Sequence, residues 1–220
     1  MHLLQPQLEV NTSSLVCTHS THQNTLVHDI VQLSPWSSSK LESEQVDWLI
    51  LHFNHWFSHH NVTLVRGDFE PEYFPATNQG PAKIQFAHGF LNSALHEISH
   101  WSIAGEKRRL LPDLGYWYAP DGRTQEQQSL FEQVEVKPQA IEWLFAQSFG
   151  RKFRVSLDNL TGDGGDGKIF KDNVYAQVQC YFSGEAKLPR DAAAFIGFIC
   201  QCTRSGTPLQ LNEFKRELLD

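Results

Sequence analysis

The chain has 220 residues, of which 40% are hydrophobic and 20% charged, as is typical of one globular domain with a well-buried core. Its net charge of −7 argues against a general nucleic-acid-binding protein, and no apolar run approaches the length that crosses a membrane. The N-terminus lacks the plan of a secretory signal, and the four cysteines form no CxxC pair and no disulfide framework. We therefore expect a cytoplasmic protein with reduced thiols.

The start of the chain differs in composition from the rest. Residues 1–40 are rich in Ser, Thr, Gln and His, which bury little apolar surface, so we expect a flexible N-terminal extension there. One folded domain should then occupy residues 41–220. Its first elements should be a helix over Glu44–His60 and two strands at Val62–Val65 and Lys83–Ala87, because the apolar residues follow the matching periods.

The next segment, Leu91–Gly105, contains the pattern HExxH, formed by His96, Glu97 and His100. Histidines four residues apart on a helix project from one face, so both imidazoles can reach one metal ion. A bare HxxxH pair more often belongs to buried histidines without a metal. A carboxylate between the two histidines on an apolar helix is much rarer by chance, and it favours a metal site. We therefore predict that His96 and His100 are metal ligands.

The ends of this helix carry further signals. Asn92 or Ser93 is expected to cap its start, and Gly105 suits the left-handed backbone that ends a helix. His88, where the chain enters the helix, either lines the metal site or only packs near it, and the sequence favours neither role.

The third metal ligand is sought in the following helical segment, Gln125–Phe149. Pro138 predicts a kink or a fresh helix start within it. Three carboxylates, Glu132, Glu135 and Glu142, are candidates for the ligand. Glu135 has the least polar neighbours, and a carboxylate that is costly to bury is well matched by a cation. A salt bridge to an arginine would satisfy Glu135 equally well.

The C-terminal part reads as a short strand, a loop and three helices. The strand is expected at Phe153–Ser156, and Asp158–Gly167 is expected to be a flexible loop, because its acids do not fit the EF-hand template. Helices are expected at Ile169–Ser183, Asp191–Cys202 and Leu211–Leu218, the last capped by Asn212.

The metal-binding pattern by itself leaves two kinds of chemistry open. In zinc peptidases with an HExxH helix, the glutamate deprotonates a metal-bound water. Here Ile103 replaces the glycine of a metzincin, and Gln139 replaces the aspartate of the thermolysin-like ExxxD pattern. Two histidines and one carboxylate also form the facial triad of non-haem iron oxygenases. Spacing alone does not choose between zinc and iron.

Longer stretches of the chain resemble the elongation factor P hydroxylase family of bacteria. The resemblance is carried by FAHGFLNSALHEISHWSIAG (residues 86–105), KRRLLPDLGYWYAPDGRTQEQQ (107–128) and FEQVEVKPQAIEWLF (131–145), with GDFEPEYFPA and VSLDNL on either side. It covers roughly residues 45–205.

The resemblance implies a fold, a reaction and a substrate. The fold would be α+β, mainly helical with a small β-sheet and a zincin-like HExxH helix, unlike the double-stranded β-helix oxygenases. The reaction would be metal-dependent hydroxylation of the β-lysylated lysine of translation elongation factor P, with dioxygen as co-substrate. His96, His100 and Glu135 would hold the metal, expected to be Fe(II), and Glu97 would orient a ligand or relay protons. A zinc-dependent peptidase-like hydrolase is the alternative, and a non-catalytic protein with a structural metal is a third possibility.

The implied substrate has a long cationic side chain, so residues in the loops near the metal helix become candidates for binding it. Carboxylates at a pocket mouth can guide a cation, and aromatic rings can contact it. The expected substrate-binding residues are Asp113, Tyr116, Trp117, Tyr118 and Asp121, with Asp68, Glu70 and Glu72 in the acidic turn as further carboxylates. The basic run Lys107–Arg109 either meets acidic surface on the partner protein or is a solvated helix end.

Overall fold

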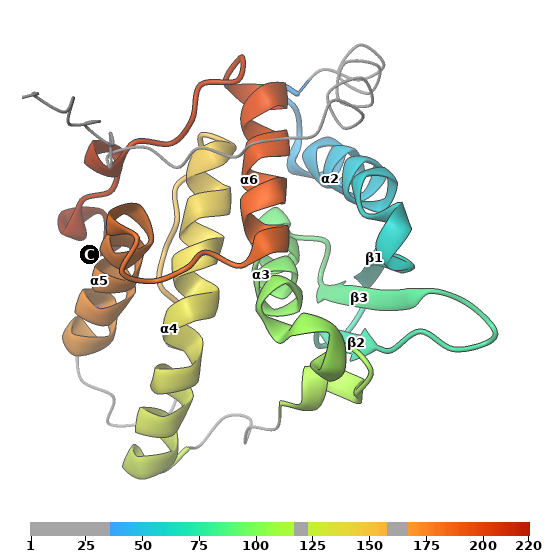
Figure 1. Cartoon of the computed structure of the whole chain (residues 1–220), viewed down its shortest axis with the longest axis horizontal. Helices are drawn as coiled ribbons and strands as arrows, with labels where there is room; N and C mark the ends of the chain where they lie inside the picture. Colours follow the sequence, from blue (N-terminus) through green and yellow to red (C-terminus); the bar gives the residue numbers. More distant parts are fainter. Residues whose placement is uncertain (1–35, 117–122, 158–166) are drawn as a thin grey trace, which may run out of the picture.

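The structure is a computed structural model that describes residues 36–116, 123–157 and 167–220. A layer of helices lies against a small β-sheet (Figure 1). The longer helices are α2 (Glu42–Trp56), α3 (Leu91–Arg108), α4 (Gln125–Ser148), α5 (Lys168–Ser183) and α6 (Arg190–Thr203). The strands are β1 (Val62–Gly67), β2 (Glu72–Phe74) and β3 (Ala82–Ala87). The described residues are therefore mainly helical with one small sheet, as expected for an α+β protein.

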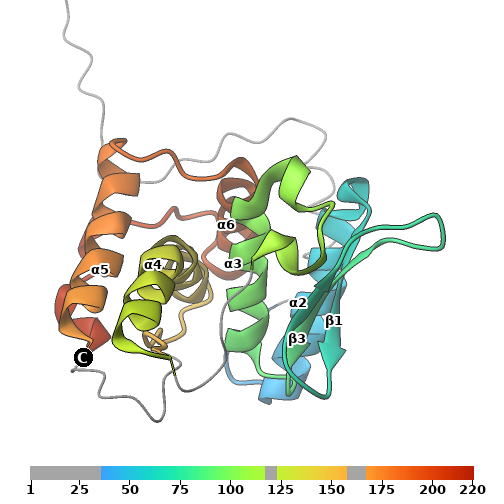
Figure 2. The ribbon, with the colours of Figure 1, turned by 90° about the horizontal axis from the view of Figure 1, so that it is seen from below.

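The sheet has the strand order β1-β3-β2, with β1 parallel and β2 antiparallel to β3. Alternate residues of β3 are buried, as in a strand with one face on the core, and helices α2 and α3 pack against β1 and β3 (Figure 2). β2 was not predicted, because three residues beside an acidic turn give no readable period. Its Tyr73 is nevertheless buried.

Helices α3 and α4 lie side by side at the centre of the protein, and α5 and α6 pack on α4 (Figure 2). Aromatic side chains fill the space between helices far apart in the sequence. Phe53 of α2 and Phe57, which follows the end of α2, both contact Trp101 of α3 and Phe195 of α6. Phe195 also contacts Phe145 of α4, so the same aromatic packing connects α3 with α4 and helps to fix the distance between them.

Among the described residues before α2, the side chain of Trp36 packs against this core. Trp36, which falls inside the expected extension, packs its ring against Trp48 and Phe149. Residues 1–35 lie outside the described residues, and so do residues 158–166 of the expected loop.

The start of α3 differs from the prediction. Its N-cap is Phe90, and neither Asn92 nor Ser93 caps it. Instead, the Leu91 amide donates a hydrogen bond to Oε1 of Glu42, while the Ser93 hydroxyl accepts one from the Ala87 amide. The Glu42 carboxylate of α2 thus accepts a hydrogen bond from a free amide at the start of α3, as the side chain of an N-cap residue would. Gly105 has the expected positive φ of +66°, but its ψ of 173° is not that of a left-handed helix, and Gly105 does not end α3, which continues to Arg108.

The expected fresh start at Pro138 is wrong, because α4 runs without a break from Gln125 to Ser148. Proline removes only the hydrogen bond to the carbonyl four residues earlier, which belongs to Val134. The Val134 side chain lies on the exposed side of the helix, where water can solvate that carbonyl.

Two predictions near the C-terminus are also wrong. Phe153–Ser156 is not a strand; its backbone is held by α4, since the Gln139 amide exchanges two hydrogen bonds with the Ser156 backbone, 2.7 and 3.0 Å long. The expected helix Leu211–Leu218 is two short 3-10 helices, Leu211–Glu213 and Arg216–Leu219, and the first is capped by Gln210 rather than Asn212. The two helices before it are confirmed to within one residue at each end.

A candidate metal centre between two helices

The two histidines of the HExxH pattern lie one turn apart on α3 and face α4. Their Nε2 atoms are 3.0 Å from each other. The side chain of His100 is 11% exposed and that of His96 is 22% exposed, so the pair is shielded but still reachable from solvent. The helical spacing therefore brings both imidazoles to one point, as the sequence predicts.

Glu135 of α4 completes the group. Its Oε1 lies 3.2 Å from Nε2 of His100, and its Oε2 lies 3.6 Å from Nε2 of His96. One ligand atom from each of the three residues falls within 4.8 Å of the others. Glu132, another candidate, instead accepts a hydrogen bond from Gln128. Among the described residues, the salt-bridge partners of Glu135 are histidines, not an arginine.

The chemistry of these donors fits a transition-metal ion. Oε2 of Glu135 is buried and has no hydrogen-bond partner among the described residues, an arrangement that costs free energy unless a cation compensates it. Two imidazole nitrogens and a carboxylate suit zinc or iron better than calcium or magnesium, which prefer oxygen ligands. Three protein ligands also leave coordination positions open for small molecules.

Two of the three candidate ligands, Glu135 and His96, have strongly shifted pKa values. Burial raises the pKa of Glu135, but the charge of His100 and its hydrogen bond, together with the charge of His96, lower it to about 2. Burial lowers the pKa of His96, but the hydrogen bond and charge of Glu142, followed by the charge of Glu135, raise it to about 10. A metal must therefore displace a proton from this group, so its binding should depend on pH.

Two more carboxylates surround the group. Glu142 lies on the same face of α4 as Glu135, two turns further on, and its Oε2 is 2.8 Å from Nδ1 of His96. Glu97 is half-buried beside the histidines. Burial raises the pKa of both carboxyl groups, although the nearby histidines oppose the shift. The contact between Glu142 and His96 was not predicted from the sequence, where Glu142 was only a candidate metal ligand.

Tyr116 is the expected substrate-binding residue that the structure places beside the centre. Its half-buried ring meets that of His100 edge-on, with the centroids 5.7 Å apart. The guanidinium of Arg108 covers one face of the Tyr116 ring at 3.5 Å, and Nε of Arg108 donates to the Leu114 carbonyl. Trp117, Tyr118 and Asp121 lie outside the described residues. Asp113 is exposed, and its Oδ1 accepts a hydrogen bond from the Tyr73 amide of β2.

The two arginines of the basic run after Gly105 have partners within the protein. Arg108 is engaged with Tyr116, as above. Arg109 stacks on Trp101, donates to the Trp101 carbonyl, and forms an ion pair of 2.6 Å with Asp191 of α6. These contacts turn both guanidinium groups toward the protein. Lys107 alone in this run is exposed.

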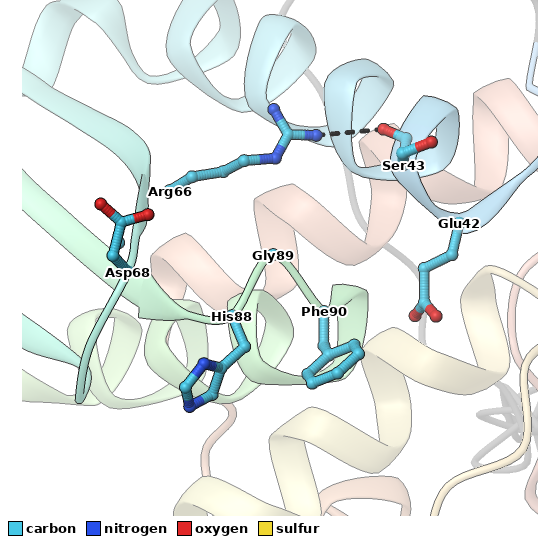
Figure 3. Close-up of a pocket in the computed structure, with 8 residues that line it drawn as sticks. Glu42, Ser43, Arg66, Asp68, His88, Gly89 and Phe90 are labelled. Atoms are coloured by element: carbon cyan, nitrogen blue, oxygen red, sulfur yellow. Dashed lines mark hydrogen bonds between the residues drawn. The ribbon is translucent and has the colours of Figure 1, made fainter.

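His88 is not part of the metal group among the described residues. It is exposed in the turn between β3 and α3, with φ of +53°, and borders a pocket of about 530 Å³ (Figure 3). The pocket is lined by Glu42, Ser43, Arg66, Gly67, Asp68, His88, Gly89 and Phe90. None of the three candidate ligands lines it, so His88 and Asp68 belong to a different part of the surface.

The described helices and two comparisons with known proteins indicate the class of this protein. In the part of the chain that the structure describes, no helix combines the length and apolar character needed to cross a bilayer. A family model described as elongation factor P hydroxylase matches residues 52–214. A protein of Haemophilus influenzae named elongation factor P lysine hydroxylase is 51% identical over 146 residues, which are 66% of this chain and 81% of that protein. The match spans α3 and α4, and the chain belongs to the elongation factor P hydroxylase family.

Proposed function

We propose that this protein hydroxylates a lysine side chain of translation elongation factor P with a metal held by His96, His100 and Glu135. The observation that carries the proposal is the convergence of these three side chains from α3 and α4 in a chain of this family. The name of the Haemophilus influenzae relative supports the substrate and the reaction. Because that substrate is a translation factor, we place the protein in the cytoplasm.

We assign Fe(II) as the metal, since two imidazoles and one carboxylate with open positions form the ligand set of non-haem iron oxygenases. When bound, ferrous iron would supply the activation of dioxygen that hydroxylation of an unactivated carbon needs. One oxygen atom would enter the substrate, and two electrons from an external reductant, with two protons, would convert the other to water, which makes the proposed enzyme a monooxygenase. The chain's contribution is to hold the ligands rigidly on two packed helices. Packing of the two helices also restricts the access of water to the ligands and leaves them partly exposed on the side of His96 and Glu97.

Glu97 is proposed to hold and transfer a proton at this opening. Burial raises the pKa of its carboxyl group, so Glu97 keeps a proton to higher pH than an exposed glutamate. Its position beside both histidines places that proton next to the reacting groups.

The lysine side chain is proposed to enter along Tyr116. Since Arg108 covers one face of that ring, the substrate would contact its free edge or hydroxyl group rather than the covered face. Asp113, Trp117, Tyr118 and Asp121 remain proposed as further contacts. We propose the β-lysylated form as the substrate, because its added amino group gives the carboxylates of this acidic protein a further cation to attract.

A zinc peptidase is the less favoured function. The thermolysin-like pattern needs an aspartate four residues after the ligand glutamate, and here Gln139 uses its amide to hold the Ser156 backbone instead. No nucleic acid or membrane takes part in the proposed reaction.

The test is to incubate the protein with lysylated elongation factor P, ferrous iron, a reductant such as ascorbate, and air, and to search for one added oxygen by mass spectrometry. Unlysylated elongation factor P serves as the substrate control, and the His100→Ala variant serves as the enzyme control. Addition of oxygen to the lysylated form, dependent on His100, is the expected result. Cleavage of the substrate would overturn the proposal. So would a substrate that stays unmodified when the protein is folded and loaded with metal.

A further inference from the structure

Two carboxylates of α4 approach the same imidazole from opposite sides. Oε2 of Glu135 lies 3.6 Å from Nε2 of His96, whereas Oε2 of Glu142 lies 2.8 Å from Nδ1 of His96. Residues seven apart on a helix share a face and are separated by about 10 Å along its axis. The His96 ring therefore lies between two groups on one face of α4.

Glu142 contacts Nδ1 of His96 and is not one of the residues that converge on Nε2 of that ring. Its near oxygen faces the ring nitrogen that points away from His100, and the three residues that converge on one point are His96, His100 and Glu135. The Glu142 carboxylate is nevertheless buried, with 10% of its side chain exposed. A buried carboxylate needs a partner, and among the described residues that partner is Nδ1 of His96.

The contact has a direct consequence for the imidazole. A carboxylate oxygen only accepts hydrogen bonds, so its contact with Nδ1 requires the proton of the neutral ring to sit on Nδ1. The lone pair of that ring then lies on Nε2, which faces Glu135 and His100. The same hydrogen bond restricts rotation of the ring before a metal binds. Less conformational entropy is therefore lost on binding.

From this geometry, and resting on the proposed function for the identity of the ligand set, we infer that Glu142 is a positioning residue. It orients His96 and fixes the tautomer that binds metal, without being a ligand. Loss of such a partner is expected to weaken metal binding about 10- to 100-fold.

Three substitutions separate a hydrogen bond from a charge. Glu142→Gln keeps the chain length and an acceptor oxygen, so it should retain metal affinity within a few-fold of the wild type. Glu142→Asp keeps the charge but withdraws it by one methylene from His96, and Glu142→Ala removes both. We expect the larger loss for Asp and Ala. Glu132→Ala is the matched control, because Glu132 lies on the same helix and is bonded only to Gln128 among the described residues.

The experiment uses the full chain freed of metal and titrated with Co(II) against a competing chelator, with circular dichroism to check folding. The cobalt absorption spectrum reports the ligand set, which should be the same in Glu142→Gln and the wild type. Unchanged affinity in both Asp and Ala variants would overturn the inference. A cobalt spectrum of Glu142→Gln that shows the loss of a ligand would also overturn it. So would a Co(II) affinity that depends on charge, with Glu142→Asp binding as tightly as the wild type and Glu142→Gln binding weakly. If Glu142→Ala fails to fold, the comparison of Asp with Gln still decides.

Failure of the proposed function would look different. A wild type that binds Co(II) through His96, His100 and Glu135 but never hydroxylates elongation factor P would overturn the function and leave the role of Glu142 testable. A wild type whose Co(II) binding is unchanged by His96→Ala would remove the ligand set itself.

Discussion

Oε1 of Glu135 lies 3.2 Å from Nε2 of His100, and this contact joins the α3 and α4 helices through two buried side chains. Neither helix contains a complete site. His96 and His100 come from one, the carboxylate comes from the other, and the packing of the helices sets the distance between them. The first prediction tests whether this junction is the metal centre.

Replacing any one of the three residues with alanine should remove metal and abolish hydroxylation, because each substitution deletes one ligand. The measurement is metal content by mass spectrometry after reconstitution with Fe(II) without oxygen, followed by the hydroxylation assay. Glu132→Ala is the control and should bind metal as the wild type does. If Glu135→Ala keeps full metal content and activity, the third ligand has been assigned wrongly.

Glu97→Gln separates proton transfer from metal binding. The amide keeps the size of the side chain but neither gains nor loses a proton, so metal content should be unchanged while the turnover number falls by about 10²- to 10⁴-fold. Single-turnover hydroxylation and metal analysis on the same sample measure the two effects. A turnover number equal to that of the wild type would remove Glu97 from the mechanism.

Arg108→Ser should lower activity through Tyr116 rather than through docking of the substrate. The arginine covers the Tyr116 ring and bonds the Leu114 carbonyl, so its loss frees a ring that borders His100. A partly buried cation–π contact of this kind contributes about 1 kcal/mol. The defect should therefore persist at high ionic strength, because a buried contact is screened less than an exposed pair.

Lys107→Ser is the matched control for Arg108→Ser, since Lys107 is the exposed residue of the same run. We expect its hydroxylation rate to equal that of the wild type at low salt. An Arg108→Ser defect that shrinks as salt is added would instead indicate electrostatic docking.

Asp191 gives a prediction for stability against pH, away from the metal centre. Burial raises the pKa of Asp191, but hydrogen bonds from Arg190 and Arg109 and the charges of Arg109 and His60 lower it below 3.8 overall. A depressed pKa stabilises the folded protein above the unfolded value, and this contribution disappears as pH falls from about 4 through the lower folded pKa. Asp191→Asn should therefore lower the free energy of unfolding by about 3 kcal/mol at pH 7, because it leaves the side chain of Arg109 without its carboxylate.

The measurement is urea unfolding of wild type and Asp191→Asn at several pH values. The gap between the two proteins should be constant near neutral pH and narrow below pH 4. A gap of the same size throughout that range would show that the charge of Asp191 does not carry the effect.

The sequence alone determined the features that depend on local geometry. Residues four apart on a helix share a face whatever surrounds them, so HExxH was enough to pair His96 with His100. Periodicity likewise located α2, β1, β3, α5 and α6 to within a few residues, because apolar spacing reports the burial of one face. The low polarity around Glu135 also pointed to the carboxylate that joins the histidines.

Tertiary structure decided everything that needs two segments to meet. The distance between Glu142 and His96, the Gln139 contact that replaces a strand at Ser156, and the capping of α3 by Glu42 each join residues that no local pattern connects. Arg109 shows the same limit. Its sequence neighbours indicated a solvated or docking charge, but packing of α3 against α6 places Asp191 within 2.6 Å. A charge follows the partners that the fold brings to it, and these are set by the packing of distant elements, not by the residues beside it in the chain.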